Sequence, residues 1–440
     1  MRRNFVYLTA SALLFLLTLP PFRQSWASAI GLVPLLLLME ARASFRRLVL
    51  YGLIAGLPFY AYGFYWILYY NAWIYFAVLL CHVPFVGLFL GLTGEIIRRI
   101  PKGPPACLIV PPLVWVCLSL LYEQTPLGTA GTQALFYQPL VWMQISRLLG
   151  VHGVVFLFVL LNAAIAWAWA PPVRKRLAPL VFTALLFLGT FLGGRRALAQ
   201  TYKADFPVAL IQHNLPLDKK WWMRNPKEVV ERYRLMALEA AKQKPRLIIF
   251  PSYSMPFDAY REPYFFQNLA RETGAYLLVS TYVSRIAKRR IAEVGQYEMA
   301  LLFSPEGKLA GLDTAVQGPP FRDIDQVFAE KSEILETPLG RSGILLCFED
   351  TLARMARSEV KRGAEVLIAL SNPGHFTKTF LPEYHLFQDQ LRAIETGLFV
   401  IRVSTHGYSA IIDPRGRVIS RSELGRQEII YGQDRRPVGP

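Results

Sequence analysis

The sequence predicts a chain of two parts, a polytopic α-helical membrane domain followed by an α/β domain. Hydrophobic residues make up 53% of the 440 residues and charged residues only 18%, whereas soluble proteins usually contain about 25% charged residues. Apolar runs long enough to approach a bilayer span fill the N-terminal half. From Phe206 onward, short apolar segments alternate with amphipathic ones. We therefore expect a transmembrane bundle over residues 1–195 and a second, extracytoplasmic domain over residues 205–440.

The bundle is expected to contain seven helices, because apolar runs occur at seven places. A span needs roughly 20 apolar residues, so the first two runs are short and the other five are sufficient. Met1-Arg2-Arg3 before the first run also resembles the start of a signal peptide. Since six further runs follow, we interpret the first run as a span. The runs cover residues 5–19, 26–40, 48–70, 72–93, 106–122, 151–170 and 177–193.

The distribution of cationic residues predicts the orientation of these spans. With the N-terminus inside, the opposite loops hold only Arg23 and Arg147 before the last span, while Arg195 and Arg196 just beyond it oppose the trend. Cytoplasmic loops are enriched in Lys and Arg, so seven crossings place the second domain outside the cytoplasm, in the periplasm or its equivalent. Nucleic-acid binding is not expected, because no stacking motif or basic helix accompanies the net charge of +17. The cations on the cytoplasmic side are Arg2, Arg3, Arg42, Arg46, Arg47, Arg98, Arg99, Lys102, Arg174, Lys175 and Arg176.

The second domain is expected to have mixed α/β layers. Two Pro- and Gly-containing turns, Ser304–Lys308 and Asp413–Arg417, are typical of hairpin connections. Helices are expected over residues 226–243, 261–273, 350–362 and 383–396. Strands are expected over Pro207–Gln212, Arg246–Phe250, Ala275–Tyr282, Tyr297–Ser304, Gly343–Phe348, Glu365–Ser371, Leu398–Val403 and Ser409–Asp413.

Two residues of this domain could take part in chemistry. Cys347 ends an apolar strand just before a predicted helix, where a helix dipole would lower the pKa of a thiol; a buried structural cysteine would fit the same pattern. His375 follows another strand end, where a histidine is usually an ordinary loop residue. The sequence contains no metal-ligand spacing and no phosphate-binding loop. We therefore expect neither a metal nor a cofactor.

Several short motifs occur in order along the second domain, namely Phe250-Pro251 with Pro256, Pro320-Phe321, Cys347-Phe348-Glu349, Ser371-Asn372 and Arg392-Ala393-Ile394-Glu395-Thr396-Gly397. Together they resemble those of a carbon-nitrogen hydrolase (nitrilase-type) domain. The membrane half narrows the resemblance to the apolipoprotein N-acyltransferase family. Its motifs there are Gly63-Phe64-Tyr65-Trp66, Gln133, Gln138-Pro139-Leu140 and Gly150-Val151-His152-Gly153.

The resemblance implies an αββα sandwich carried on a membrane bundle. In this family a cysteine takes an acyl chain from a phospholipid and passes it to the N-terminal amine of a lipoprotein that carries a diacylglyceryl-cysteine. A glutamate acts as general base, and a lysine stabilises the tetrahedral oxyanion. By resemblance, Cys347 is the nucleophile and Glu349 the acid two residues further on. Asp323 stands where the family has a glutamate.

Two of the family's catalytic positions carry other residues. Ser252 replaces the base glutamate, and Ala315 replaces the lysine. His375 could restore a base if it met Cys347 as a thiol–imidazole pair, because histidine titrates near pH 6.5. The sequence leaves two functions open. One is N-acyl transfer with impaired or rearranged catalysis, and the other is a non-catalytic, degenerate paralogue that binds lipid or lipoprotein.

Overall fold

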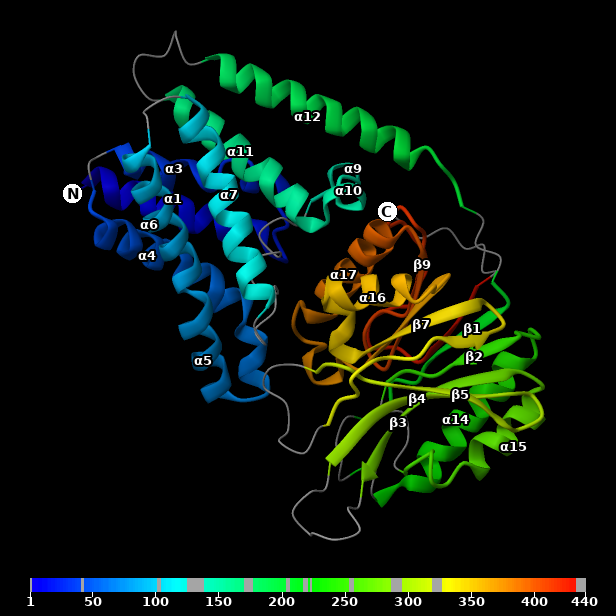
Figure 1. Ribbon diagram of the computed structural model, residues 1–440. Helices are drawn as coiled ribbons and strands as arrows, with labels where there is room; N and C mark the ends of the chain where they lie inside the picture. Colours follow the sequence, from blue (N-terminus) through cyan, green and yellow to red (C-terminus); the bar gives the residue numbers. More distant parts are fainter. Residues whose placement is uncertain are drawn as a thin grey trace. The chain divides into compact units, whose positions relative to one another are not determined.

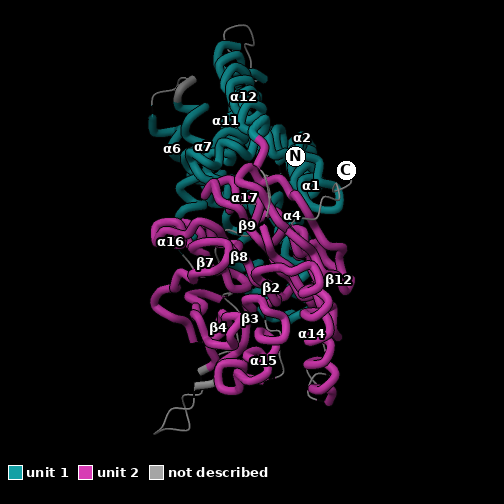
Figure 2. The backbone as a smooth tube through the Cα atoms, turned by 90° about the vertical axis from the view of Figure 1, so that its right-hand side faces the viewer, with its two compact units in different colours: residues 1–200 teal, residues 201–440 magenta. Residues whose placement is uncertain are grey.

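The chain forms two compact units, Met1–Gln200 and Thr201–Pro440, in a computed structural model (Figures 1 and 2). The residues that the structure describes are 2–40, 43–100, 104–124, 138–169, 177–202, 206–216, 221, 224–252, 257–285, 295–318 and 327–432. Several residues of the sequence analysis lie outside these ranges, namely Arg42, Lys102, Gln133, Arg174–Arg176, Pro256, Pro320-Phe321 and Asp323.

The first unit is helical throughout its described residues, as its apolar composition predicts. Its α-helices are α1 (Arg2–Thr18), α2 (Ser25–Ser28), α3 (Val33–Leu37), α4 (Phe45–Gly63), α5 (Ala72–His82), α6 (Pro84–Arg99), α7 (Pro104–Glu123), α9 (Leu140–Met143), α10 (Ser146–Leu149), α11 (Val151–Trp169) and α12 (Leu177–Leu198).

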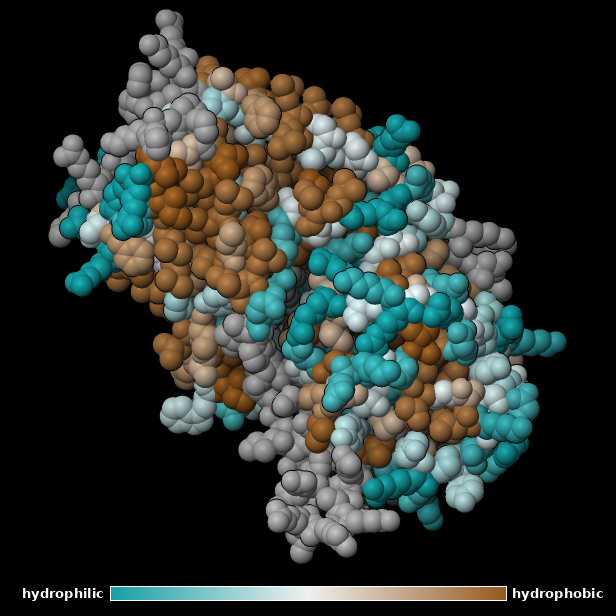
Figure 3. All heavy atoms as spheres, in the orientation of Figure 1, coloured by the Kyte–Doolittle hydropathy of each residue, from teal (hydrophilic) through white to brown (hydrophobic). Residues whose placement is uncertain are grey.

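Four described helical stretches are long and apolar enough to cross a membrane: Ala72–Arg99, Ala106–Glu123, Val151–Trp169 and Leu177–Leu198. The remaining three predicted spans are helical but shorter or more polar. The 17-residue α1 is short, the second run divides into α2 and α3, and α4 carries Arg46 and Arg47 near its start. The unit is a membrane domain, and apolar side chains dominate the face shown in Figure 3. The number of seven spans stays a prediction.

Helices α4 and α6 pack with their backbones in close contact. A Cβ atom added to Gly52 of α4 would lie 2.4 Å from the carbonyl oxygen of Val86, and one added to Gly87 of α6 would lie 3.0 Å from that of Val49. Glycine is therefore required at Gly52. Small residues permit this approach between helices in a membrane, where no hydrophobic effect drives helices together.

The second unit contains two six-stranded sheets, as the αββα prediction requires. The first sheet has the order β12-β1-β2-β3-β4-β5, and the second has the order β11-β10-β9-β8-β7-β6. The strands are β1 (Val208–Gln212), β2 (Leu247–Ile249), β3 (Tyr276–Arg285), β4 (Gly295–Phe303), β5 (Leu309–Thr314), β6 (Leu335–Thr337), β7 (Gly340–Leu346), β8 (Val366–Ser371), β9 (Phe399–Ser404), β10 (Ala410–Ile412), β11 (Val418–Arg421) and β12 (Glu428–Tyr431).

Among the described residues, four α-helices cover the outer faces of the sandwich (Figure 1). On the first sheet, α14 (Pro226–Ala241) and α15 (Tyr264–Thr273) bury an apolar cluster. On the second sheet, α16 (Ala353–Lys361) and α17 (Leu381–Thr396) bury another. A third cluster fills the space between the sheets. Since both faces of both sheets are buried, most residues of their central strands are apolar, which is why the sequence identifies them.

Both predicted hairpin turns are confirmed. Gly307 and Gly416 have φ angles of 72° and 79°, which a residue without a Cβ adopts easily. The amide of Ser304 donates to the carbonyl oxygen of Lys308 at 2.8 Å, and that of Asp413 donates to Arg417 at 2.9 Å. These turns connect β4 to β5 and β10 to β11. The connection from β4 to β5 matters for the site, because it brings Ala315 beside β4.

Candidate functional site

Cys347 stands at a sharp bend that follows strand β7. Ile344, Leu345 and Leu346 before it are buried, and β7 pairs in parallel with β8. The chain then turns into a 3₁₀ helix, Cys347–Thr351, and Cys347 itself has a φ angle of 51°. This left-handed conformation is rare for a residue with a side chain. The bend leaves Cys347 partly exposed, although Leu346 before it and Glu349 two residues after it are buried.

The pKa of the Cys347 thiol lies above its ordinary value in this environment. Burial raises its pKa well above the usual range, and the negative charges of Glu298 and Asp350 act in the same direction. Backbone hydrogen bonds from Asn372 and Phe348 oppose the rise only in part. The expectation that a helix dipole lowers this pKa is therefore wrong. Helix α16 begins only at Ala353, and the dipole acts within about one turn of a helix end.

Both carboxylate oxygens of Glu349 accept hydrogen bonds from backbone amides near Cys347. Its Oε1 accepts hydrogen bonds from the amides of Val316 at 2.7 Å and Gln317 at 3.0 Å. Its Oε2 accepts one from Leu346 at 2.9 Å. Burial raises the pKa of Glu349 to about 8. The side chain thus connects the bend at Cys347 to the segment that follows β5.

A buried ionic network lies on the other side of the bend. Asp350 accepts from Arg402 Nη1 at 2.7 Å, and His385 Nδ1 lies 2.8 Å from its Oδ2. The same Arg402 nitrogen lies 2.7 Å from Asp389 Oδ2, while Arg402 Nη2 donates to Ser371 at 2.8 Å. Burial acts to raise the pKa of Asp350, but His385 and Arg402 hold it below its ordinary value. The network ties the bend to strands β8 and β9 and to helix α17.

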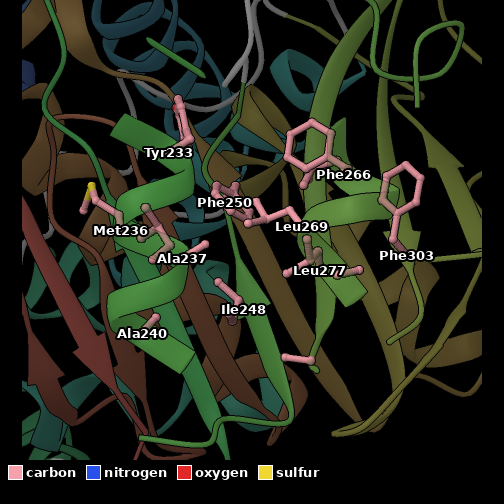
Figure 4. Close-up of a cluster of buried hydrophobic side chains, with 14 of the residues drawn as sticks. Tyr233, Met236, Ala237, Ala240, Ile248, Phe250, Phe266, Leu269, Leu277 and Phe303 are labelled. Atoms are coloured by element: carbon pink, nitrogen blue, oxygen red, sulfur yellow. The ribbon is translucent and has the colours of Figure 1, made fainter. Parts of the chain in front are cut away.

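Ser252 follows strand β2 and is fixed by the core beneath it. Phe250, two residues earlier, is fully buried and its ring packs against those of Tyr233 and Phe266 at centroid distances of 5.4 and 5.8 Å (Figure 4). This packing holds the end of β2 in place. The Ser252 side chain is buried, and its hydroxyl donates a hydrogen bond to Oε1 of Glu298.

Glu298 is a buried carboxylate on β4 that the sequence analysis did not single out. Ser280 Oγ donates to the same oxygen, Oε1, at 3.5 Å. Burial raises the pKa of Glu298, and hydrogen bonds from Ser252, Ser280 and Tyr282 oppose the rise. One signal in the sequence could have identified it. Glu298 directly precedes the apolar run Met299–Phe303, and a carboxylate is unusual in a buried strand.

Ala315 lies directly beside this carboxylate's backbone. Its amide donates to the carbonyl oxygen of Glu298 at 2.9 Å, and its side chain is buried in the cluster between the sheets. The structure therefore brings Ser252 and Ala315 to the same residue, Glu298. Asp323 lies outside the described residues. His375 belongs to a short 3₁₀ helix, Gly374–Phe376, but its side chain is not described, so its pairing with Cys347 stays a prediction.

The described residues hold no group of three or more His, Cys, Asp or Glu side chains arranged for a metal ion. A thiol with a raised pKa needs a base before it can attack an ester or thioester, because the thiolate is the reactive form.

Two family profiles match the chain in succession. The profile described as "Apolipoprotein N-acyltransferase N-terminal domain" matches residues 11–164, and the carbon-nitrogen hydrolase profile matches residues 207–436. The chain belongs to the apolipoprotein N-acyltransferase family.

Relatives from this family align along nearly the whole chain. The apolipoprotein N-acyltransferase of Geobacter metallireducens is 27% identical over 99% of this chain and 90% of its own length. That of Gloeobacter violaceus is 27% identical over 91% of this chain and 82% of its own length. The crystal structure of a carbon-nitrogen hydrolase from Helicobacter pylori G27 superposes with a TM-score of 0.41 at 18% identity, over 51% of this chain and 87% of that chain. The two six-stranded sheets, the helices on their outer faces and the carbon-nitrogen hydrolase match confirm the fold class predicted from the sequence.

Proposed function

We propose that this chain moves an acyl chain from a phospholipid, through a thioester on Cys347, to the N-terminal amine of a diacylglyceryl-cysteine lipoprotein. The observation that carries the proposal is the presentation of Cys347 at a strained, partly exposed bend in a chain that also has a membrane domain. A phospholipid and a lipidated peptide are both held in a bilayer, so an enzyme that joins them must work at the membrane surface.

The reaction divides into two transfers at one sulfur. Cys347 loses its proton to a base, and its sulfur forms a bond to the ester carbonyl carbon of the lipid. The tetrahedral intermediate breaks its C–O bond, and the lysolipid oxygen takes up the proton. The lipoprotein amine then attacks the thioester, the C–S bond breaks, the amine nitrogen loses a proton to the base, and the thiol takes one up. Splitting one difficult transfer into two easier ones is the general advantage of covalent catalysis.

Glu349 supports this chemistry as a positioning residue. Its carboxylate is occupied by the amides of Leu346, Val316 and Gln317, which leaves it poorly placed to accept the thiol proton. Ala315 has no group that could stabilise an oxyanion. Since one such donor is worth about 10²–10³-fold in rate, we expect turnover well below the enzyme median of about 10 s⁻¹.

The proposal includes the orientation deduced from the cationic residues. The second unit lies outside the cytoplasm at the bacterial inner membrane, on the side where exported lipoproteins expose their N-terminal amines. The excess of Lys and Arg in the loops assigned to the cytoplasm supports this side.

Labelled acyl transfer tests the function. Full-length protein in detergent is incubated with phospholipid carrying a fluorescent acyl chain and with a synthetic diacylglyceryl-cysteine peptide. We expect a label on the protein that neutral hydroxylamine removes, followed by a label on the peptide amine. Cys347→Ala should give neither. Binding of the labelled lipid without any transfer, even after long incubation, would favour the alternative function, a non-catalytic lipid- or lipoprotein-binding paralogue. This alternative is supported by Ser252 and Ala315, which stand where the family has its base glutamate and its lysine.

A further inference from the structure

We propose that Glu298 is the general base of this site and substitutes for the glutamate that the family has at the position of Ser252. The inference rests on the acyl-transfer function proposed above. Its starting point is the hydrogen bond from the Ser252 hydroxyl to Glu298 Oε1. A carboxylate oxygen thus lies in direct contact with the side chain at the very position where the family's carboxylate is missing.

The strand register places Glu298 next to both substituted positions. It lies opposite Tyr282 of β3, and its carbonyl oxygen accepts the amide of Ala315 on its other side. Side chains that face each other across antiparallel strands project from the same face of a sheet. Glu298 and Ala315 therefore share one face, and Ser252 reaches that face from the end of β2.

That face is the inner one, which is directed at the strand carrying the nucleophile. Ala300 and Leu302, which follow Glu298 at intervals of two along β4, belong to the apolar cluster between the sheets, together with Ile344 and Leu346 of β7. Strands β4 and β7 contact each other across the sandwich. Glu298 is accordingly near enough to Cys347 for its negative charge to raise the pKa of the thiol.

The electrostatics suit a base rather than a permanently ionised partner. Burial raises the pKa of Glu298, and a carboxylate with a raised pKa binds a proton more readily. The described polar groups around it are the hydroxyls of Ser252, Ser280 and Tyr282 and the Cys347 thiol, and none of these is cationic. The proton moves from Cys347 Sγ to the Glu298 carboxylate, and from there to the lysolipid oxygen that leaves. The same carboxylate then takes the proton released by the attacking amine and passes one to Cys347 Sγ.

Another glutamate in the same unit provides a matched control. Glu359 of α16 is also buried, and it too accepts a hydrogen bond from a serine hydroxyl, that of Ser332. Burial raises the pKa of Glu359 as well. It lies on the outer helical layer, whereas the charges that raise the pKa of Cys347 are those of Glu298 and Asp350. A purely structural effect of removing a buried carboxylate should appear equally at Glu359.

The test measures the acylation of Cys347 by a small activated ester, which requires no knowledge of the natural lipid. Full-length protein in detergent is mixed with p-nitrophenyl butyrate, and the release of nitrophenolate and the mass of the butyrylated protein are followed. We expect Glu298→Gln to slow acylation by about 10²-fold or more, the usual contribution of a general base. The double variant Ser252→Glu with Glu298→Gln should recover most of this loss, because it returns a carboxylate to the neighbouring position. Glu359→Gln should acylate at the wild-type rate, and Cys347→Ala should not acylate.

The sign of the Glu298→Gln effect separates a base from a mere neighbour. If Glu298 acted only through its charge, neutralising it would lower the pKa of Cys347 and speed acylation. As a base, its loss slows acylation, and the residual rate should rise about tenfold per pH unit as hydroxide takes over. A Glu298→Gln rate equal to or above wild type, or no recovery in the double variant, would overturn the inference. These results are independent of lipoprotein acylation: if the ester results hold but no acyl chain reaches the lipopeptide, the proposed function fails and the base stands.

Discussion

Arg402 Nη1 lies 2.7 Å from Asp350 Oδ2, and neither side chain has any exposed surface. Asp350 is three residues from Cys347, whereas Arg402 belongs to β9, two strands away from β7 in the sheet. The ion pair therefore connects the bend at Cys347 to strand β9 of the same sheet. Because Arg402 also contacts Asp389, one cation compensates two buried carboxylates.

Replacing Arg402 by Met should destabilise the second unit by about 3–5 kcal/mol, since it leaves buried charges without a partner. Thermal unfolding of the full-length protein in detergent measures the loss. Arg426→Met is the control, because the Arg426 side chain is 70% exposed and pairs only with exposed Glu423; such pairs contribute about 0–1 kcal/mol. Equal effects of the two substitutions would contradict the importance of the buried network.

The second unit should lose stability as the pH rises from about 5 to 8. Burial raises the pKa of Asp313 to about 7 and that of Glu349 to about 8. Both groups bind protons more tightly in the folded state than in the unfolded state. Their stabilisation is therefore complete below the unfolded pKa, near 4, and is lost as the pH rises through the folded pKa. Asp350 acts oppositely but titrates below this window, because its pKa is lowered.

Glu349→Gln should flatten this pH dependence, since the amide does not titrate. The free energy of unfolding at pH 5, 6, 7 and 8, followed by proteolytic susceptibility, gives the slope. Glu336→Gln serves as the comparison, because that side chain is 77% exposed. A slope in Glu349→Gln as steep as in the wild type would exclude Glu349 as its source.

Asn162 should be the most sensitive polar residue of α11. It is fully buried, its Oδ1 accepts the amide of Leu32 at 2.8 Å, and its Nδ2 donates to the carbonyl oxygen of Ser28 at 2.8 Å. These two backbone groups flank the break between α2 and α3, and no water is available in a bilayer core to satisfy them. Asn162→Leu should therefore cost about 1–3 kcal/mol.

Thermal stability in detergent tests this prediction, with Asn4→Leu for comparison. The Asn4 side chain donates to the Tyr51 hydroxyl and satisfies no helix break. We expect the melting temperature to fall clearly for Asn162→Leu and little for Asn4→Leu. Similar melting temperatures for wild type and Asn162→Leu would show that the break is satisfied in another way.

Reporter fusions test the proposed orientation. Fusions that end at Arg47, Arg99 and Arg176 should give cytoplasmic signals, because these residues belong to the cation-rich segments assigned to the cytoplasm. A fusion at Gly340, within the second unit, should give a periplasmic signal. A cytoplasmic signal at Gly340 would contradict the proposed orientation, because the second unit would then have no access to exported lipoproteins.

The sequence predicts the long, strongly patterned elements of the fold well and the short ones poorly. Most of strand β8 and the last three residues of β7, Ile344–Leu346, are apolar runs, so composition alone identifies them. In contrast, β6 and β12 are only three and four residues long. Strand β12 exists because it pairs with β1 from the other end of the domain, and local patterning contains no trace of such a long-range pairing.

The residues of the candidate site also divide into those that local sequence identifies and those that only the fold brings together. Cys347 is predictable because it ends an apolar strand, and Ser252 and Ala315 are found through motifs that resemble those of a family. Glu298 is not, because its partner Ser252 lies 46 residues away and only the sheet order brings the two together. Likewise, the pKa of Cys347 depends on burial and on the charges of Glu298 and Asp350. The dipole of the helix predicted after Cys347 therefore suggested a lowered pKa, whereas the pKa is raised.

The left-handed backbone conformation of Cys347 lowers the stability of the second unit. A side chain at a φ angle of 51° costs about 1–2 kcal/mol relative to a relaxed conformation, and glycine alone avoids that cost. The chain thus holds Cys347, the proposed nucleophile, in a backbone conformation that most side chains avoid. Glycine at this bend would remove the proposed nucleophile and should raise the melting temperature, so the proposed chemistry limits the heat resistance of the second unit.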